Sequence, residues 1–391
     1  MNTQPSCFSR ASIRTIAGLA AFASIAFSNP ANAACNNGVV DAGEICVAPP
    51  VSIWAPGAPL VAVISADLNG DGILDVAAAT ANRSFVRLGT GVGFGAWSFW
   101  SQPGVGFRDI AAGDFDGDGD LDLALADSIG NQVIVRWNQG GINFTPGTAF
   151  AVGGQPVRVL AARLNADARA DFVTLNLASD TATVRLAVAG GFAAGVNYPV
   201  GDTDDIALGD CDASGRQDLI YYNGQGTPAF LIARRNNGAG GLGPQIVTTL
   251  PMFDPVFGPL EPQAIAAGDL NGDGLADATV ATSWSRLVPA TSNGNCTFTP
   301  RPYGFTWAFT FRIRAFDFDE NGDTDIVAPH GIGNRYSVAF GNGAGSFLPY
   351  DDTVLPAAGV YDLAFGDWNG DGFGDVLIAG NSDLLYQRGT P

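Results

Sequence analysis

The chain of 391 residues contains no lysine and a single histidine, and only 15% of its residues are charged. All 19 basic residues are arginine, against 38 aspartates and glutamates, which gives a net charge of −19. An acidic surface disfavours nucleic acid and anionic membranes as partners, because lysine and arginine supply most of the affinity for phosphate groups. One histidine, His330, cannot complete a zinc site, and the motifs GxSxG and CxxC are absent. The sequence therefore favours a monomeric binding protein over an enzyme.

Long hydrophobic runs are also missing, apart from one near the amino terminus. Arg10 and Arg14 precede an apolar run over residues 16–27, and small residues at 31–33 provide a cleavage site. This layout predicts a secretory signal peptide over residues 1–33. Elsewhere no stretch reaches the roughly 18 apolar residues that a membrane-spanning helix needs. We therefore expect a secreted, extracellular protein, with a periplasmic location or a lipoprotein anchored at Cys35 as alternatives.

Cysteine is scarce, with five residues of which Cys7 lies in the predicted signal peptide. Cys35 and Cys46 bracket a short segment, and in an oxidising compartment they are expected to form a disulfide within a linker over residues 34–50. Cys211 and Cys296 are expected to remain unpaired, because Cys211 occupies a position that is Leu, Phe or Trp in equivalent segments and therefore suits packing.

What the sequence does have is aspartate, clustered with glycine in short loops. Residues 114–122, DFDGDGDLD, contain five aspartates in nine positions. Two carboxylates 4 Å apart repel by about 4 kcal/mol at an effective dielectric of about 20, so a compact turn of this composition requires a cation. Oxygen ligands at positions 1, 3, 5 and 9, a backbone carbonyl at position 7 and glycine at position 6 match a calcium loop, since calcium takes six to eight oxygens.

The loop recurs seven times, with starts at residues 67, 114, 163, 210, 269, 317 and 367. Short alternating apolar runs separated by Gly, Asn, Asp and Pro flank each copy, which is typical of β-strands. The repeat predicts an all-β fold over residues 51–391, a seven-bladed β-propeller with four-stranded antiparallel blades. The seventh unit ends after its third strand, around residues 384–387, so residues 51–55 are expected to supply the missing strand and close the ring.

These loops, together with the Phe94-Gly95 pair, resemble those of the VCBS/FG-GAP repeat family, whose members form integrin-α-like seven-bladed propellers. The resemblance covers about residues 51–391 and implies that calcium binds between the first and second strands of a blade. It implies about five sites, with position 7 contributing its carbonyl and with the following ligands: Asp67, Asn69, Asp71, Ile73 and Asp75; Asp114, Asp116, Asp118, Asp120 and Asp122; Asp269, Asn271, Asp273, Leu275 and Asp277; Asp317, Asp319, Asn321, Asp323 and Asp325; Asp367, Asn369, Asp371, Phe373 and Asp375.

The other two loops depart from the pattern. The loop at 210 is expected to bind weakly if at all, because Arg216 stands at position 7, and its ligands would be Asp210, Asp212, Ser214 and Asp218. In the loop at 163, Arg163 replaces the first aspartate and Arg169 stands at position 7. We expect one of these arginines to pair with Asp167 and Asp171 in place of the ion. An EF-hand or dockerin is a competing interpretation, but both need flanking helices and a carboxylate at position 12.

Calcium is expected to be structural, because an ion that binds only the folded state stabilises it. The resemblance implies that ligands bind the face opposite the metal loops, where strands two and three and successive blades are connected. The long interval after the loop at 210 places an inserted segment there, residues 252–262, and the candidate contacts are Trp100, Tyr222, Phe253, Phe257 and Trp284. We expect a secreted binding or adhesion module for a protein or surface glycan. The alternative is a carbohydrate-active enzyme similar to polysaccharide lyases.

Overall fold

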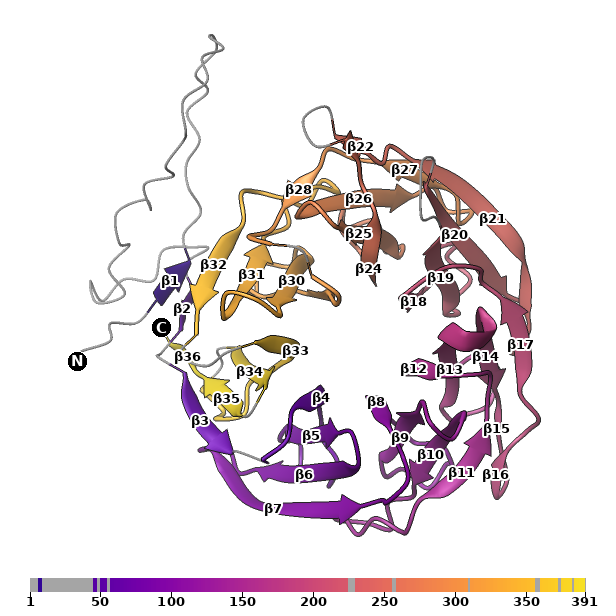
Figure 1. The fold of residues 1–391 in the computed structure, drawn as a ribbon, viewed down its shortest axis with the longest axis vertical. Coiled ribbons are helices and arrows are strands. Elements are labelled where there is room, and N and C mark those ends of the chain that lie inside the picture. The colour runs from indigo at the N-terminus through magenta and orange to yellow at the C-terminus, as the bar shows by residue number, and fades with distance from the viewer. Residues whose placement is uncertain are drawn as a thin grey trace, which may run out of the picture.

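The computed structural model describes residues 6–8, 45–47, 50–54, 57–223, 229–254, 258–308, 310–355, 359–371, 374–381 and 383–390. Its strands form a closed ring of seven antiparallel blades, which confirms the predicted propeller (Figure 1). The first strand of each blade lines the central channel and the fourth lies at the rim. The one helical element in the described part of the chain is a 3-10 turn, η1 (Leu177–Ser179).

Blades one to six each take their strands from one repeat, from the inner strand to the outer strand, and blade seven takes its outer strand from the start of the propeller. Their bounds are as follows: blade one, β4 (Leu60–Ala66), β5 (Asp75–Thr80), β6 (Arg83–Gly89) and β7 (Phe94–Ser101); blade two, β8 (Phe107–Gly113), β9 (Asp122–Asp127), β10 (Gln132–Arg136) and β11 (Thr148–Ala151); blade three, β12 (Pro156–Ala162), β13 (Asp171–Asn176), β14 (Thr181–Arg185) and β17 (Val196–Pro199); blade four, β18 (Ile206–Gly209), β19 (Asp218–Asn223), β20 (Ala229–Asn236) and β21 (Leu242–Leu250); blade five, β24 (Pro262–Gly268), β25 (Asp277–Thr282), β26 (Arg286–Ser292) and β27 (Phe298–Pro300); blade six, β29 (Arg314–Phe316), β30 (Asp325–His330), β31 (Arg335–Ala339) and β32 (Asp351–Val354); blade seven, β33 (Val360–Gly366), β34 (Asp375–Gly380), β35 (Leu384–Gln387) and β3 (Val51–Trp54). Smaller strands lie outside this pattern: β15 (Ala187–Val188), β16 (Gly191–Phe192), β22 (Phe253–Asp254), β23 (Gly258–Pro259) and β28 (Gly304–Phe305).

The ring closes by pairing the two ends of the repeat region. β3 is the outer strand of blade seven and pairs antiparallel with β35, with Val51 opposite Tyr386. This confirms the predicted closure, in which residues 51–55 complete the last blade. Closure between strands far apart in sequence leaves no open seam in the ring.

The predicted signal peptide and linker fall mostly outside the described residues. Within them, β1 (Ser6–Phe8) pairs with β2 (Ile45–Val47), and β2 pairs with β36 (Gly389–Thr390). In this register Cys7 lies opposite Cys46. Cys35 lies outside the described residues, so its disulfide with Cys46 stays a prediction.

The hydrophobic core lies between the blades. The second strand of a blade is buried on both faces, and all six residues of β9 are buried, for example. Such strands read as continuous apolar runs instead of alternating patterns. Seven apolar clusters each combine residues of two neighbouring blades, as Phe115 of blade two and Phe172 of blade three do. The wedge-shaped interfaces between blades therefore hold the ring together.

A ring of charged side chains crosses the central channel at one level. Five residues before each loop start, the seven inner segments carry Ala62, Asp109, Arg158, Asp205, Ala264, Arg312 and Asp362. Arg312 Nη1 lies 2.7 Å from Asp362 and 3.0 Å from Asp109, so it links blade six with blades seven and two. Arg158 Nε lies 2.7 Å from Asp205. A further arginine, Arg314, lies 3.0 Å from Asp362.

The aspartates of this ionic ring also accept backbone hydrogen bonds from the next blade. Val159 N–H donates to Asp109 at 3.1 Å, and Val63 N–H donates to Asp362 at 3.1 Å. Burial by itself would raise the pKa of Asp362, but Arg312 and Arg314 hold this pKa below its ordinary value. The ionic ring therefore connects blades across the axis as well as between neighbours.

Replacing Asp362 by alanine should destabilise the fold strongly, because Arg312 and Arg314 would keep their charge inside the protein without this carboxylate. Breaking a buried ion pair in this way typically costs about 3–5 kcal/mol in the free energy of unfolding. Urea denaturation measures the change, with the exposed Asp202→Ala as a control that should shift stability by less than about 0.5 kcal/mol. Equal effects of the two substitutions would contradict a stabilising role of the ring.

Candidate metal sites and ligand surface

The last aspartate of each loop is buried and hydrogen-bonded in the same way in all seven blades. In the loop at 114, Asp122 Oδ2 accepts the N–H of Phe115 at 3.0 Å, and its Oδ1 accepts the N–H of Asn138 at 2.7 Å. The other six carboxylates, none of them accessible to solvent, make the same two contacts: Asp75, Asp171, Asp218, Asp277, Asp325 and Asp375. Each one connects the start of the loop to the end of the third strand.

We call this buried carboxylate, with its two backbone N–H donors, the aspartate clip. From the sequence, its aspartate was predicted only to bind metal. The structure shows a second role, because the clip is also present in the loops at 163 and 210, which depart from the calcium pattern. A carboxylate oxygen has more than one lone pair, so one N–H bond on each oxygen leaves room for an ion. The clip is therefore compatible with a metal and does not depend on one.

The first aspartate organises the rest of the loop. In the loop at 114, Asp114 accepts the N–H of Gly117 at 2.7 Å and that of Gly119 at 3.1 Å. Gly119 has a φ of +96°, a conformation that favours glycine. The loops at 67, 210, 269 and 317 make the equivalent bond from position 6 to the first aspartate, through Gly72, Gly215, Gly274 and Gly322.

Oxygen ligands converge inside the loops. In the loops at 114, 210 and 317, one carboxylate oxygen from each of positions 1, 3 and 9 lies within 4.8 Å of the others. In the loops at 67, 269 and 367, position 3 is asparagine, whose amide oxygen is also a calcium ligand type. Because every available ligand is oxygen, the residues fit calcium better than zinc or copper. Gly372 and Phe373 of the last loop lie outside the described residues.

The loop at 163 differs, but not as the sequence predicted. Arg169 reaches the neighbouring loop, where its Nε–H donates to the carbonyl of Asp116 at 3.0 Å. Asp171 accepts the two backbone N–H groups of the clip, and Asp167 accepts the backbone N–H of Arg169 itself at 3.0 Å. The expected pairing of an arginine with Asp167 and Asp171 was therefore wrong, because the backbone already satisfies these carboxylates and the side chain extends away.

In the loop at 210 a cation is already close to the ligands. Arg235 Nε lies 3.3 Å from Asp212 Oδ2. The first aspartate of this loop, Asp210, still accepts the N–H of Gly215 at 2.6 Å, so the loop keeps the shape of the others. An arginine at this distance competes with a metal for the same carboxylate, which supports the prediction that this site binds weakly.

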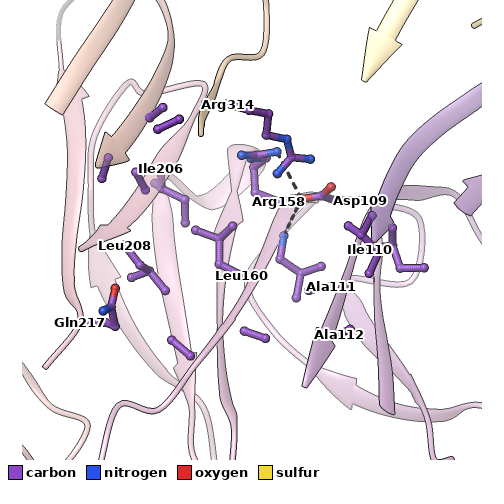
Figure 2. A pocket seen from close by; sticks show the side chains of 18 of the residues that line it. Asp109, Ile110, Ala111, Ala112, Arg158, Leu160, Ile206, Leu208, Gln217 and Arg314 are labelled. Carbon is purple, nitrogen blue, oxygen red and sulfur yellow. Dashed lines mark hydrogen bonds and ion pairs between the residues drawn. The ribbon is translucent and has the colours of Figure 1, made fainter. Parts of the chain in front are cut away.

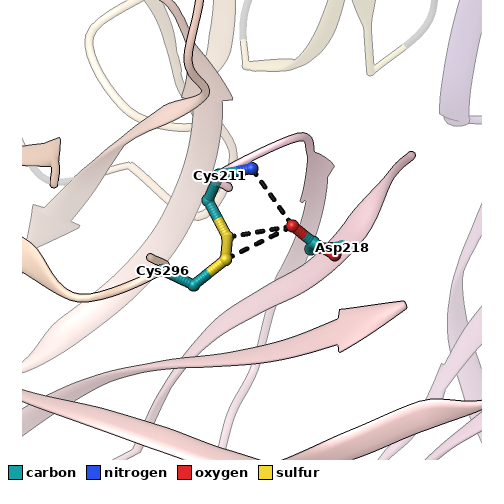
Figure 3. Close-up of side chains that lie close together, drawn as sticks. All are labelled: Cys211, Asp218 and Cys296. Atoms are coloured by element: carbon teal, nitrogen blue, oxygen red, sulfur yellow. Dashed lines mark hydrogen bonds between the residues drawn. A yellow bond between two sulfur atoms is a disulfide. The ribbon is translucent and has the colours of Figure 1, made fainter. Parts of the chain in front are cut away.

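A disulfide joins Cys211 to Cys296, which corrects the expectation that both remain unpaired (Figure 3). Cys211 is the second residue of its loop, and Cys296 lies in the turn between β26 and β27 of the next blade, with their Cα atoms 4.9 Å apart. In blade two the equivalent residue, Phe115, packs on Phe192 of the next blade, with ring centroids 5.5 Å apart. The disulfide thus replaces an apolar contact that other blades make at the same place. Alignment of the repeats shows that Cys211 occupies this contact position. It does not show that Cys296, 85 residues away, is its partner.

The clip carboxylates are buried enough to hold protons when no metal is present. Burial raises the pKa of Asp122 to about 7, although its backbone N–H partners lower it and Asp116 and Asp118 raise it further. Burial likewise raises the pKa of Asp325 to about 7 and that of Asp277 to about 6. A bound cation would favour the ionised forms instead.

The stability of the calcium-free protein should decrease as the pH rises from about 5 to 8. A raised pKa means that the folded state binds protons that the unfolded state has released above about pH 4, so this contribution is lost as the pH passes through about 7. Calcium should reverse the trend and raise the melting temperature more at pH 8 than at pH 5, because protons compete for its ligands. Differential scanning calorimetry in chelator and in calcium measures both profiles. A chelated protein that melts higher at pH 8 than at pH 5 would contradict the prediction.

Two of the five predicted ligand-face residues pack between blades, and the prediction was wrong for the fully packed one, Tyr222. Tyr222 is only 2% exposed and belongs to the core between blades four and five. Trp100 packs edge-on against Phe144 of blade two, with ring centroids 5.2 Å apart. Both lie where aromatic side chains fill the gap between blades. Phe257 lies outside the described residues.

The other two predicted residues are exposed and lie in connections next to blade five. Phe253, 60% exposed, lies in the β22–β23 hairpin between blades four and five, and Trp284, 48% exposed, lies in the turn between β25 and β26. Both belong to connections of the type predicted on the face opposite the metal loops. The sequence analysis did not single out Phe305, which is 44% exposed and pairs with Arg286 across β26 and β28.

A buried ion pair holds these aromatic residues in place. Asp254 accepts the Nε–H of Arg286 at 2.9 Å, and the Arg286 guanidinium lies 4.4 Å from the ring centroid of Phe305. The Asp254–Arg286 contact connects the hairpin to blade five, and a hydrogen bond from Thr306 N–H to the Ser285 carbonyl holds Phe305 beside the turn. We call Phe253, Asp254, Trp284, Arg286 and Phe305 the blade-five surface.

His330 is fully buried, and its Nε2 lies 2.7 Å from Ser337 Oγ. Its ring also meets Trp307 edge-on, with centroids 5.9 Å apart. It is the last residue of β30, and its ring is not accessible to solvent.

A family model described as an FG-GAP-like repeat matches residues 67–125, 114–174 and 317–378. The chain is a seven-bladed propeller that carries FG-GAP-like repeats. Comparison with curated proteins gives no match.

Solved structures with the same fold share 11–18% sequence identity with this chain. BBS1N from its complex with ARL6DN has a TM-score of 0.61 at 13% identity, over 89% of this chain and 97% of that chain. An Agrocybe aegerita lectin that recognises non-reducing terminal N-acetylglucosamine has a TM-score of 0.56 at 18% identity, over 84% and 87%. A humanised mutant of Chaetomium thermophilum Polycomb Repressive Complex 2 has a TM-score of 0.58 at 11% identity, over 88% and 97%. At these identities the likenesses show the fold alone. In the described residues of the FG-GAP-like propeller, no helix has the length and apolar character to cross a membrane.

Proposed function

We propose that the protein is an exported, calcium-stabilised module that binds an extracellular ligand through the blade-five surface. The observation that carries this proposal is the group of exposed aromatic rings, Phe253, Trp284 and Phe305, beside the Asp254–Arg286 pair. Large exposed apolar side chains that gather on one face of a protein indicate an interaction site. The propeller is a scaffold that presents connections of this kind on a rigid body.

A surface glycan suits this surface better than a protein. A sugar ring has apolar faces that pack on aromatic side chains, and Phe253, Trp284 and Phe305 offer such contacts. The fold is also similar to that of a lectin that recognises terminal N-acetylglucosamine. Protein ligands remain the alternative within the same proposal.

Export and calcium complete the proposal. The Cys211–Cys296 disulfide supports an oxidising compartment, since disulfides persist mainly outside the cytosol. Removal of the predicted signal peptide would also remove β1, which pairs outside the propeller blades. The convergent loop carboxylates would hold calcium as a structural ion in about five loops, with the loop at 210 as a possible sixth.

A glycan array with the calcium-loaded, signal-cleaved protein tests the proposal. Trp284→Ala and Phe305→Ala should each weaken the binding of a selected glycan by about tenfold or more, because truncated aromatic anchors typically cost over 1 kcal/mol. Phe99→Ala is the matched control, since Phe99 is 64% exposed on β7 of blade one. Binding that survives both blade-five substitutions would rule out this surface. Unsaturated sugar ends released from anionic polysaccharides would instead support a lyase.

A further inference from the structure

The central channel contains a cavity of about 790 Å³ that residues of the ionic ring line at one side. The walls are the inner strands of six blades, and the side chains that line them are mostly small or apolar, including Ile64, Ala111, Leu160, Ala207 and Ala266. Small-molecule sites commonly have this size and this apolar lining with a few polar groups. The cavity is separate from the blade-five surface, none of whose residues line it.

The floor of this cavity carries charged groups. Asp109, Arg158 and Arg314 all line it, and they gather at one side of the cavity, away from Gln217 (Figure 2). At the other side the lining includes Arg163, Gly215 and Gln217, which belong to metal loops. A molecule would therefore enter from the metal-loop face, past the exposed Arg163, and its far end would meet the ionic ring.

Two arginines of the floor have hydrogen-bonding capacity that the ionic ring does not use. Arg158 is 6% exposed, and although its Nε and Nη1 lie 2.7 and 3.5 Å from Asp205 and Asp109, neither atom forms a hydrogen bond of acceptable geometry. Arg314 binds Asp362 through Nε and Nη2, and its side chain is 28% exposed. A buried guanidinium whose donors are poorly aligned with their acceptors, like that of Arg158, is costly, and a carboxylate fits guanidinium geometry well.

We propose that the channel binds a small amphiphilic carboxylate, with its apolar chain along Leu160 and its neighbours and its carboxylate on Arg158 and Arg314. The apolar walls account for the chain, since each buried methylene is favourable. The floor accounts for the head group, because an uncharged molecule would leave Arg158 Nε and Nη1 without a well-aligned acceptor. Binding there needs neither a glycan nor the blade-five surface.

Isothermal titration calorimetry of the signal-cleaved protein with octanoate, and with 1-octanol as the uncharged analogue, tests this site. Wild type should bind octanoate saturably at one site. Leu160→Trp fills the cavity and should weaken the binding of both molecules by about tenfold or more. Arg314→Gln should weaken the binding of octanoate by about tenfold, while the affinity for 1-octanol should change by less than about threefold.

Phe99→Ala serves as the control and should leave both affinities unchanged, and near-ultraviolet circular dichroism confirms that each variant is folded. Absence of octanoate binding to wild type would overturn the proposal, as would binding that Leu160→Trp does not affect. Equal losses of octanoate and 1-octanol in Arg314→Gln would overturn the role of the arginines. Glycan binding is measured independently, so failure of this site leaves the proposed function untouched.

Discussion

One buried carboxylate per blade is the interaction on which the rest of the structure depends. A carboxylate out of contact with water is costly unless hydrogen bonds satisfy it. Asp122 shows the solution, with one oxygen on the N–H that opens the loop and the other on the N–H that ends the third strand. Repeated in seven blades, this clip fixes three strands relative to each other, and it brings the remaining loop oxygens to where a calcium ion can share them.

The loops then differ in how they join neighbouring blades. Phe115 packs on Phe192 across one interface, and a disulfide from Cys211 to Cys296 occupies the same place in another. From within the loop that lacks its first aspartate, Arg169 donates to the carbonyl of Asp116 in the preceding loop. The blades are thus joined on this face by apolar packing, by a covalent bond or by an arginine. On the channel axis the ionic ring adds contacts between blades that are not neighbours, as Arg312 does with Asp109.

The repeat made most of this fold predictable from sequence. The seven copies of the loop predicted the number of blades, and the incomplete seventh unit predicted the pairing of β3 with β35. Burial was harder to predict, because the rings of Tyr222 and Trp100 fill interfaces that form only when blades pack. The Cys211–Cys296 pair and the ionic ring share this difficulty. Their members are far apart in sequence and meet only when blades pack around the ring, so no local pattern reveals them.

The account rests on calcium completing the acidic loops, and the metal content of the purified protein tests this most directly. After export, purification in calcium and extensive dialysis, inductively coupled plasma mass spectrometry should give about five calcium ions per chain, because five loops carry the full ligand set. Substitution of Asp118 by alanine should reduce the content by about one ion. A wild-type protein that retains no calcium and melts at the same temperature with and without added calcium would contradict the account, since the clips alone would then be sufficient to hold the loops.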